Sequence, residues 1–200
     1  MSLIISYIGK NGCLMVGDKR RIGFLGDKEK REKLEEYLYT GAIRTDEELL
    51  KVAEEQEVTL NISDDAEKVR IIGNVLVGEV QHKTPFESRR KRIYATTNGY
   101  IMTEIIGSHI DKYDDGSSSI VVFGNKLTKM KANELIKKYW NPKGSWNDFS
   151  TVFKKIMEEI SAITPSVSKE YDIYAQSVKL DKKEAQKLLR ETMVEDVKEL

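Results

Sequence analysis

The residues that could do chemistry lie at the start of the chain, where Ser2 and Asp18 stand at the two ends of an expected hairpin. Nearly continuous apolar runs cover residues 3–8 and 13–16, as is typical of strands buried on both faces. Asn11-Gly12 between them predicts a tight type I′ turn, because both residues tolerate positive φ. A hairpin of this length returns Asp18 to the beginning of the first strand.

Ser2 gains a chemical role when Met1 is removed, and serine is small enough for an aminopeptidase to do so. The free α-amine, with a pKa of about 7.7–8.0, can then take the proton of the hydroxyl and make it a nucleophile. Asp18 can orient this site and balance its positive charge. For these residues taken alone the other interpretation stays open, namely a permissive second residue and an acidic strand end.

The surrounding sequence supplies a family context for both residues. The hairpin, with Ser2 at its head and Gly17-Asp18-Lys19-Arg20 at its end, resembles that of proteasome β-subunits and other N-terminal-nucleophile hydrolases. More specifically, most of residues 2–174 resembles the archaeal connectases, a proteasome-β-like family of methanogens. The stretches that carry this resemblance are residues 17–21, 74–80, 93–97, 119–125 and 164–174.

The resemblance implies both a fold and a reaction. The superfamily folds as a four-layer αββα sandwich, whereas the order of strands and helices in the sequence alone supports only α+β. Connectases are protein ligases that form an acyl-enzyme at a Lys-Asp-Pro-Gly-Ala motif, in the A subunit of the methanogen methyltransferase complex, and pass it to a chain that begins with proline. The resemblance therefore makes Ser2 the nucleophile and Asp18 a catalytic residue of a transpeptidase that needs no cofactor.

A catalytic lysine is also implied, because proteasome β-subunits carry one at the head of a strand that enters a hairpin. Lys91 resembles this lysine, since it lies in the basic run 88–92 that directly precedes the apolar run 93–95, and it is the favoured candidate. Lys112 is the rival, because it precedes an expected turn at Asp114-Asp115-Gly116 and a strand that leads into helices.

Two amphipathic segments follow the hairpin and predict a helical pair over about residues 27–57. Thr45 with Glu48 predicts a capping box for its second helix. The proteasome pattern has no helical pair here, so we interpret the segment as an insertion, either a lid or substrate clamp or a stabilising flap. We expect one domain over residues 1–178, followed over 179–200 by a helix that either begins a second region or frays.

The remaining elements are predicted from local signals. Residues 70–80 indicate a strand with an irregularity at Gly73. Ser145 with Asp148, and Asp181 with Glu184, predict the starts of two further helices. The first of these helices carries an apolar stripe at helical spacing, typical of core, formed by Phe149, Val152, Phe153, Ile156, Ile160 and Ile163.

The composition excludes several other classes. The chain has 33 basic and 33 acidic residues, so no global field attracts nucleic acid or anionic lipid. The single cysteine excludes an internal disulfide and favours a reducing cytoplasm. The two histidines stand apart from each other, which argues against a metal site. No apolar run is long enough to insert into a membrane. We expect a cytoplasmic protein that takes a protein or peptide substrate, and a monomer rather than a proteasome-like ring, because the insertion alters the packing surfaces.

Other functions stay open. A non-catalytic proteasome-like binding module, in which Met1 is retained, is the main alternative to an enzyme. An N-terminal-nucleophile peptidase would use the same residues but release its acyl-enzyme to water. A nucleotide-processing enzyme on a related fold is a more distant possibility.

Overall fold

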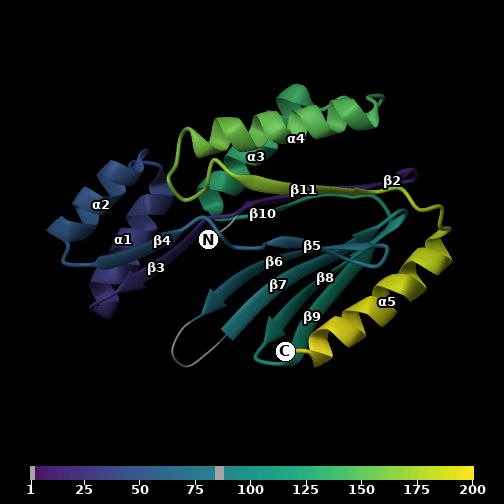
Figure 1. Ribbon diagram of the computed structural model, residues 1–200, viewed down its shortest axis with the longest axis horizontal. Helices are drawn as coiled ribbons and strands as arrows, with labels where there is room; N and C mark the ends of the chain where they lie inside the picture. The colour runs from purple at the N-terminus through teal and green to yellow at the C-terminus, as the bar shows by residue number, and fades with distance from the viewer. Residues whose placement is uncertain (1–2, 84–87) are drawn as a thin grey trace. The chain divides into compact units, whose positions relative to one another are not determined.

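The computed structural model describes residues 3–83 and 88–200, and within them the chain forms two compact units. One unit holds Leu3, Asp18–Glu67 and Val122–Tyr171, and the other holds Ile4–Gly17, Lys68–Val121 and Asp172–Leu200. Figure 1 labels the helices and strands of both. Helices and antiparallel sheets occur in the same chain, which confirms the α+β class predicted from the sequence.

The predicted N-terminal hairpin is present, with β1 (Ile4–Gly9) and β2 (Gly12–Asp18) paired antiparallel. Its turn differs from the prediction. Lys10 and Asn11 make the connection, and Gly12 already belongs to the second strand, with a φ of 144° that favours glycine. The predicted turn at Asn11-Gly12 is therefore wrong in position, by one residue, and in type, because neither Lys10 nor Asn11 has the positive φ of a type I′ turn. The hairpin that it implied is present.

The hairpin lies at the centre of a four-stranded sheet of order β10-β1-β2-β11, in which β10 is Ser119–Phe123 and β11 is Tyr171–Gln176. A second sheet has five antiparallel strands in chain order: β5 (Val69–Ile72), β6 (Val75–Lys83), β7 (Ser88–Thr96), β8 (Gly99–Ile106) and β9 (His109–Gly116).

Two local predictions about the second sheet are wrong. Residues 70–80 are a hairpin rather than one irregular strand, and Gly73 turns between β5 and β6 with a φ of 55°. Asp114-Asp115-Gly116 ends β9 instead of forming a turn. In both places pairing with a neighbouring strand, which a single segment does not reveal, decides the local conformation.

The hairpin sheet packs against the second sheet at Gly78 of β6. A Cβ added there would lie 2.8 Å from Sδ of Met15, so a larger residue would force the Met15 side chain to move. Residues on the opposite face of the second sheet, including Tyr94, pack instead with Leu189 of α5 (Lys182–Lys198). This helix covers β7 and β8. This unit therefore has the order sheet, sheet, helix (Figure 1), and the fourth, helical layer stays a prediction.

The predicted helical pair is confirmed. α1 (Lys28–Thr40) and α2 (Asp46–Glu55) lie between β3 (Arg21–Leu25) and β4 (Thr59–Ser63), which pair antiparallel as a two-stranded sheet. The pair has a buried core of its own, formed by Leu34, Leu38, Ile43, Leu49, Ala53 and Val58. Such a core allows these elements to hold a defined shape of their own.

The start of α2 combines a confirmed and a displaced cap. Thr45 Oγ1 accepts a hydrogen bond from the Glu48 amide at 3.1 Å, as predicted. The Glu48 carboxylate accepts from the Arg44 amide at 2.8 Å instead of returning to Thr45. Both side chains thus hold the first turn of α2. The Glu48 carboxylate binds the amide one residue before the one that a capping box would use.

The same unit contains α3 (Lys126–Tyr139) and α4 (Trp146–Ser161), which pack on each other. Ser145 and Asp148 form the predicted capping box at the start of α4. Trp140 stacks on Phe149 with ring centroids 4.3 Å apart. The predicted core stripe is largely confirmed, since Phe149, Phe153, Ile156 and Ile160 are buried, whereas Ile163 beyond the helix is exposed.

Candidate functional site

Asp18 is a fully buried carboxylate at the end of β2. Its Oδ1 accepts a hydrogen bond from the Leu3 amide at 2.6 Å, and its Oδ2 accepts from the Arg20 amide at 2.9 Å. The Asp18 amide donates to the Leu3 carbonyl at 3.1 Å. A buried carboxylate needs such donors, and here they tie Asp18 to the start of β1. Ser2, the predicted nucleophile, lies outside the described residues.

Arg20 is a buried cation two residues beyond Asp18, with 6% of its surface exposed. Its guanidinium donates to Asp64 from Nε at 2.6 Å and Nη2 at 2.9 Å, and to Asp46 from Nη1 at 2.6 Å. Nη1 also donates to the Pro165 carbonyl at 3.0 Å. Burial opposes the charged form, but the hydrogen bonds to Asp64 and Asp46 outweigh it and raise the pKa of Arg20. Arg20 is therefore a permanently charged junction between three segments of the chain.

Buried hydroxyl groups hold the loop after α4 to Lys19, the residue between Asp18 and Arg20. Ser168 Oγ accepts from the Lys19 amide at 2.8 Å and donates to the Glu170 carbonyl at 2.6 Å. Within the loop, Ser166 Oγ accepts from the Asn125 side chain at 3.3 Å. Residues 164–174, one of the stretches that carry the family resemblance, thus also support the segment around Asp18.

Lys68 is a buried lysine that the sequence analysis missed, with 7% of its surface exposed. Its Cβ would lie 3.5 Å from a Cβ added at Gly17, the residue before Asp18. A signal for Lys68 was available. The description of a lysine at the head of a strand that enters a hairpin fits Lys68 once Gly73 is read as a turn, because β5 begins at Val69.

Lys91 and Lys112 occupy a different environment. Lys91 lies inside β7, and its exposed Nζ pairs with Glu104 of β8 at 2.7 Å. Lys112 of β9 stands opposite the same glutamate. The hydrogen bond and charge of Lys91, and to a smaller extent the charge of Lys112, lower the pKa of Glu104. The structure brings these two lysines together around a surface carboxylate, and their catalytic role stays a prediction.

A comparison with protein families identifies the chain. The family model described as "Connectase MJ0548-like, N-terminal domain" matches residues 1–198. The chain belongs to this connectase family. The resemblance inferred from its motifs is therefore confirmed.

Other comparisons add less. The search of curated proteins gave no match to this connectase chain. Among solved structures, the HslV protein of Trypanosoma brucei is 15% identical, and the match covers 88% of this chain and 99% of that one with a TM-score of 0.36. At this score the similarity in structure is weak, so the fold is described by the topology given above.

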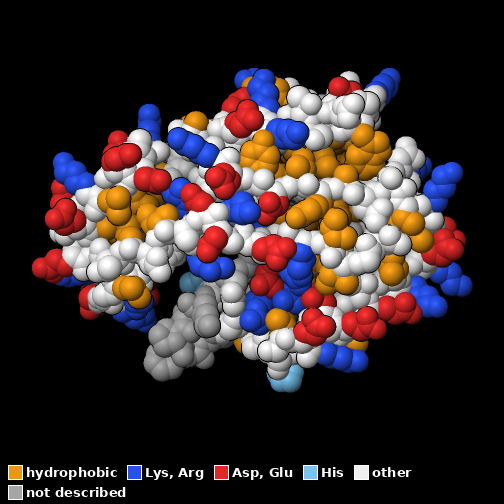
Figure 2. Space-filling model, in the orientation of Figure 1, with side chains coloured by type: hydrophobic (Ala, Val, Ile, Leu, Met, Phe, Trp, Pro, Cys, Tyr) orange, Lys and Arg blue, Asp and Glu red, His pale blue; other side chains and the backbone are white. Residues whose placement is uncertain are grey.

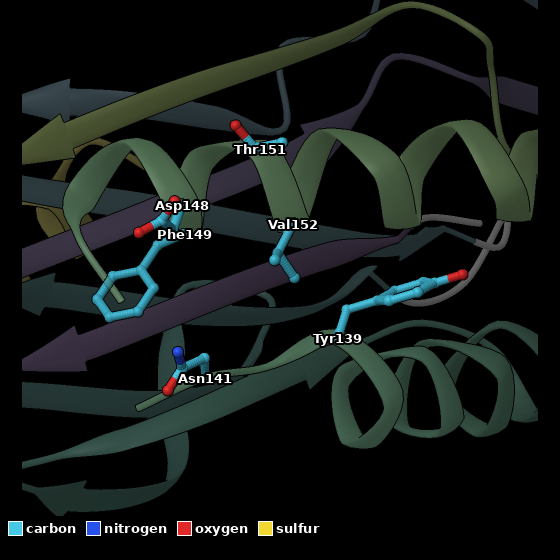
Figure 3. Close-up of a pocket in the computed structure, with 6 residues that line it drawn as sticks. All are labelled: Tyr139, Asn141, Asp148, Phe149, Thr151 and Val152. Carbon is cyan, nitrogen blue, oxygen red and sulfur yellow. The ribbon is translucent and has the colours of Figure 1, made fainter. Parts of the chain in front are cut away.

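A pocket lies at the junction of α3 and α4. Figure 3 shows Tyr139 and Val152 facing it from the two helices. Asn141, Asp148, Phe149 and Thr151 complete its lining. None of the predicted site residues lines this pocket, so we assign it no part in the chemistry.

The described residues give no sign of a metal site. No group of three or more His, Cys, Asp or Glu side chains within residues 3–83 and 88–200 is arranged to hold a metal ion. None of the helices described is both long and apolar enough to span a membrane. On the face in Figure 2, acidic and basic side chains are interspersed, in agreement with the equal numbers of each in the sequence.

Proposed function

We propose that the chain is a protein ligase of the connectase type in which Ser2 is the nucleophile and Asp18 orients it. The observation that carries this proposal is the buried Asp18 carboxylate, which accepts the Leu3 amide at 2.6 Å. This amide belongs to the residue that follows Ser2 in the chain. Asp18 thus restrains the backbone next to the proposed nucleophile.

The proposed reaction begins after removal of Met1. Ser2 Oγ bonds to the carbonyl carbon of a peptide while its proton passes to the free α-amine of Ser2. Backbone N–H groups can stabilise the oxyanion that forms. The peptide C–N bond then breaks, the proton leaves with the departing amine, and an ester joins Ser2 to the acyl fragment. An incoming amine reverses these steps and forms a new peptide bond.

Lys68 is proposed as the lysine of the site. Its burial and its position beside Gly17, which precedes Asp18, support this role. A cation near the α-amine favours the neutral form of that amine, which is the form able to accept the proton. Lys91, the lysine favoured from the sequence, remains the alternative.

Transfer to an amine rather than to water distinguishes a ligase from a peptidase. A departing or incoming chain that begins with proline loses little conformational entropy on binding, so it can occupy the site in preference to water. The Lys-Asp-Pro-Gly-Ala motif of the methanogen methyltransferase A subunit is the proposed substrate. We further propose a cytoplasmic archaeal monomer without a proteasome-like ring, and a four-layer αββα sandwich fold.

The test is mass spectrometry of the intact protein and of its reaction with peptides. Removal of Met1 followed by incubation with a Lys-Asp-Pro-Gly-Ala peptide should give a reversible adduct with little hydrolysis. A second peptide that begins Pro-Gly-Ala should then exchange into the product. Ser2→Ala, which also permits removal of Met1, should form no adduct, whereas Ser2→Thr keeps a hydroxyl and should form one.

Three results would contradict the proposal. An adduct on Ser2→Ala would exclude Ser2 as the nucleophile. Steady accumulation of hydrolysed peptide would indicate a peptidase. Absence of any adduct on a chain with a proven free Ser2 would leave a non-catalytic binding module.

A further inference from the structure

The inserted helical pair is connected to Asp18 by a short series of direct contacts. Asp46, the first residue of α2, accepts hydrogen bonds from Nη1 of Arg20 at 2.6 Å and from Nη2 at 3.3 Å. The main-chain amide of Arg20 in turn donates to Oδ2 of Asp18 at 2.9 Å. One residue thus binds the insertion through its side chain and the candidate catalytic carboxylate through its backbone.

The geometry at Arg20 leaves little freedom. Asp64 and Asp46 each meet the guanidinium with two oxygens, and the planar, rigid guanidinium group favours such paired contacts. The Pro165 carbonyl occupies a further donor on Nη1. All three guanidinium nitrogens are engaged, so the side chain cannot turn toward one partner without weakening its bonds to another.

The start of α2 is equally well defined. Thr45 caps the helix, and the Glu48 carboxylate holds the Arg44 amide just before it. An acidic residue in the first helical turn is favoured by the helix dipole. A displacement of α2 would therefore move the Asp46 carboxylate, and the Arg20 side chain that is bonded to it would move as well.

We infer that Asp46 is a positioning residue for Asp18, acting through Arg20, and that the inserted helical pair sets the geometry of the active site. The inference rests on the proposed role of Asp18. It assigns the insertion a function that neither a substrate clamp nor a stabilising flap describes. A clamp would change how tightly substrate binds, and a flap would change only the stability of the fold.

The first test compares Asp46→Asn with Glu47→Gln, a matched variant that removes the same charge from an exposed residue of the same helical turn. We expect Asp46→Asn to lower the kcat of adduct formation about tenfold, the size of one lost charge-assisted hydrogen bond, with KM unchanged. Asp46→Glu keeps the charge and should recover part of the rate. Glu47→Gln should leave both constants near the wild-type values.

Two kinetic outcomes would overturn the inference. A raised KM with an unchanged kcat would make the insertion a clamp on the substrate. A lower melting temperature, with both constants unchanged at a temperature where the variant is folded, would make it a stabilising flap.

A second test does not depend on activity. The Leu3 and Arg20 amides both donate to Asp18, so their hydrogen exchange reports on its position directly. Asp46→Asn should speed their exchange about tenfold relative to Glu47→Gln. Unchanged exchange would overturn the inference even in an active enzyme. If the wild type forms no adduct, the proposed function fails, and the exchange measurement still decides the link between Asp46 and Asp18.

Discussion

Arg20 and Arg92 are two buried arginines with the same chemistry in different units of the molecule. Arg20 binds Asp46 and Asp64 next to the strand end that carries Asp18. Arg92 of β7 binds Glu79 of β6 and, at 2.8 Å, Asp196 of α5. For both, burial opposes the charge and hydrogen bonds to acceptors outweigh it, so that the pKa is raised.

The difference lies in what each arginine holds. Asp196 also accepts from the Tyr94 hydroxyl at 2.9 Å and from Arg70 at 2.8 Å. This network fixes α5 on the sheet, and no predicted site residue takes part in it. Arg20 instead joins a helix, a loop and a candidate catalytic carboxylate. Whether a buried ion pair has a functional role therefore depends on the residues that it contacts.

The comparison extends first to the lysines, for which we expect the largest effect. Lys68 is buried beside Gly17, whereas Lys91 and Lys112 surround the surface residue Glu104. Lys68→Met should lower the rate of adduct formation by about 10²–10⁴-fold, as expected for loss of a group that assists proton transfer. Lys91→Met and Lys112→Met should stay near the wild-type rate.

Circular dichroism of each lysine variant controls for loss of fold, and Lys68→Arg tests the need for a positive charge at that place. An inactive Lys91→Met together with a normal Lys68→Met would restore the lysine favoured by the sequence analysis.

The second comparison is between the two buried carboxylates. Asp18→Asn replaces one of the two carboxylate oxygens by an NH₂ group. This donor then faces the N–H of Leu3 or of Arg20, so the variant should slow adduct formation about a hundredfold. Asp196→Asn should keep the wild-type rate, yet lose about 1–3 kcal/mol of unfolding free energy because its donors are left unsatisfied. Single-turnover kinetics and urea unfolding measure the two effects. Equal rates for the two variants would make Asp18 a structural residue.

The elements that the sequence predicted well depend on local signals. The capping residues Ser145 and Asp181 start helices as expected, because a cap acts within one turn of the chain. Periodicity placed Phe153 in the core, since a helical stripe buries the same face throughout. The first hairpin was recovered from its two apolar runs.

The parts that the sequence did not predict depend on contacts between distant segments. Arg20 meets residues 26 and 44 positions away, and no spacing rule specifies such partners. The burial of Lys68, whose Cβ lies close to Gly17, likewise depends on segments far apart in the sequence. The turn at Gly73 was misread because alternation continues through a tight hairpin, and only the pairing of β5 with β6 reveals it. The sequence thus named Asp18 as a candidate, but it did not name the residues that hold Asp18 in place.

The third prediction concerns stability in the unit without the candidate carboxylate. Arg92→Met leaves Glu79 and Asp196 without their shared cation and should cost about 3–5 kcal/mol of unfolding free energy. Arg190→Met is the matched control on α5, since Arg190 forms an exposed pair with Asp115 at 3.5 Å. That variant should cost less than about 1 kcal/mol. A loss in Arg92→Met as small as in the control would show that α5 does not depend on this network.

The smallest effect is expected at the exposed pair of Lys91 and Glu104. Lys91 lowers the pKa of Glu104, so the stabilisation is present above the unfolded pKa of about 4.3 and is lost as pH falls through the lower folded pKa. Lys91→Met should therefore cost about 0.2–1 kcal/mol at pH 7, and the cost should shrink toward zero in acid and in high salt. Urea unfolding of the variant and the wild type across pH measures this difference. A cost that persists in acid would mean that Lys91 stabilises the sheet through its aliphatic chain, because the charge of Glu104 is absent there.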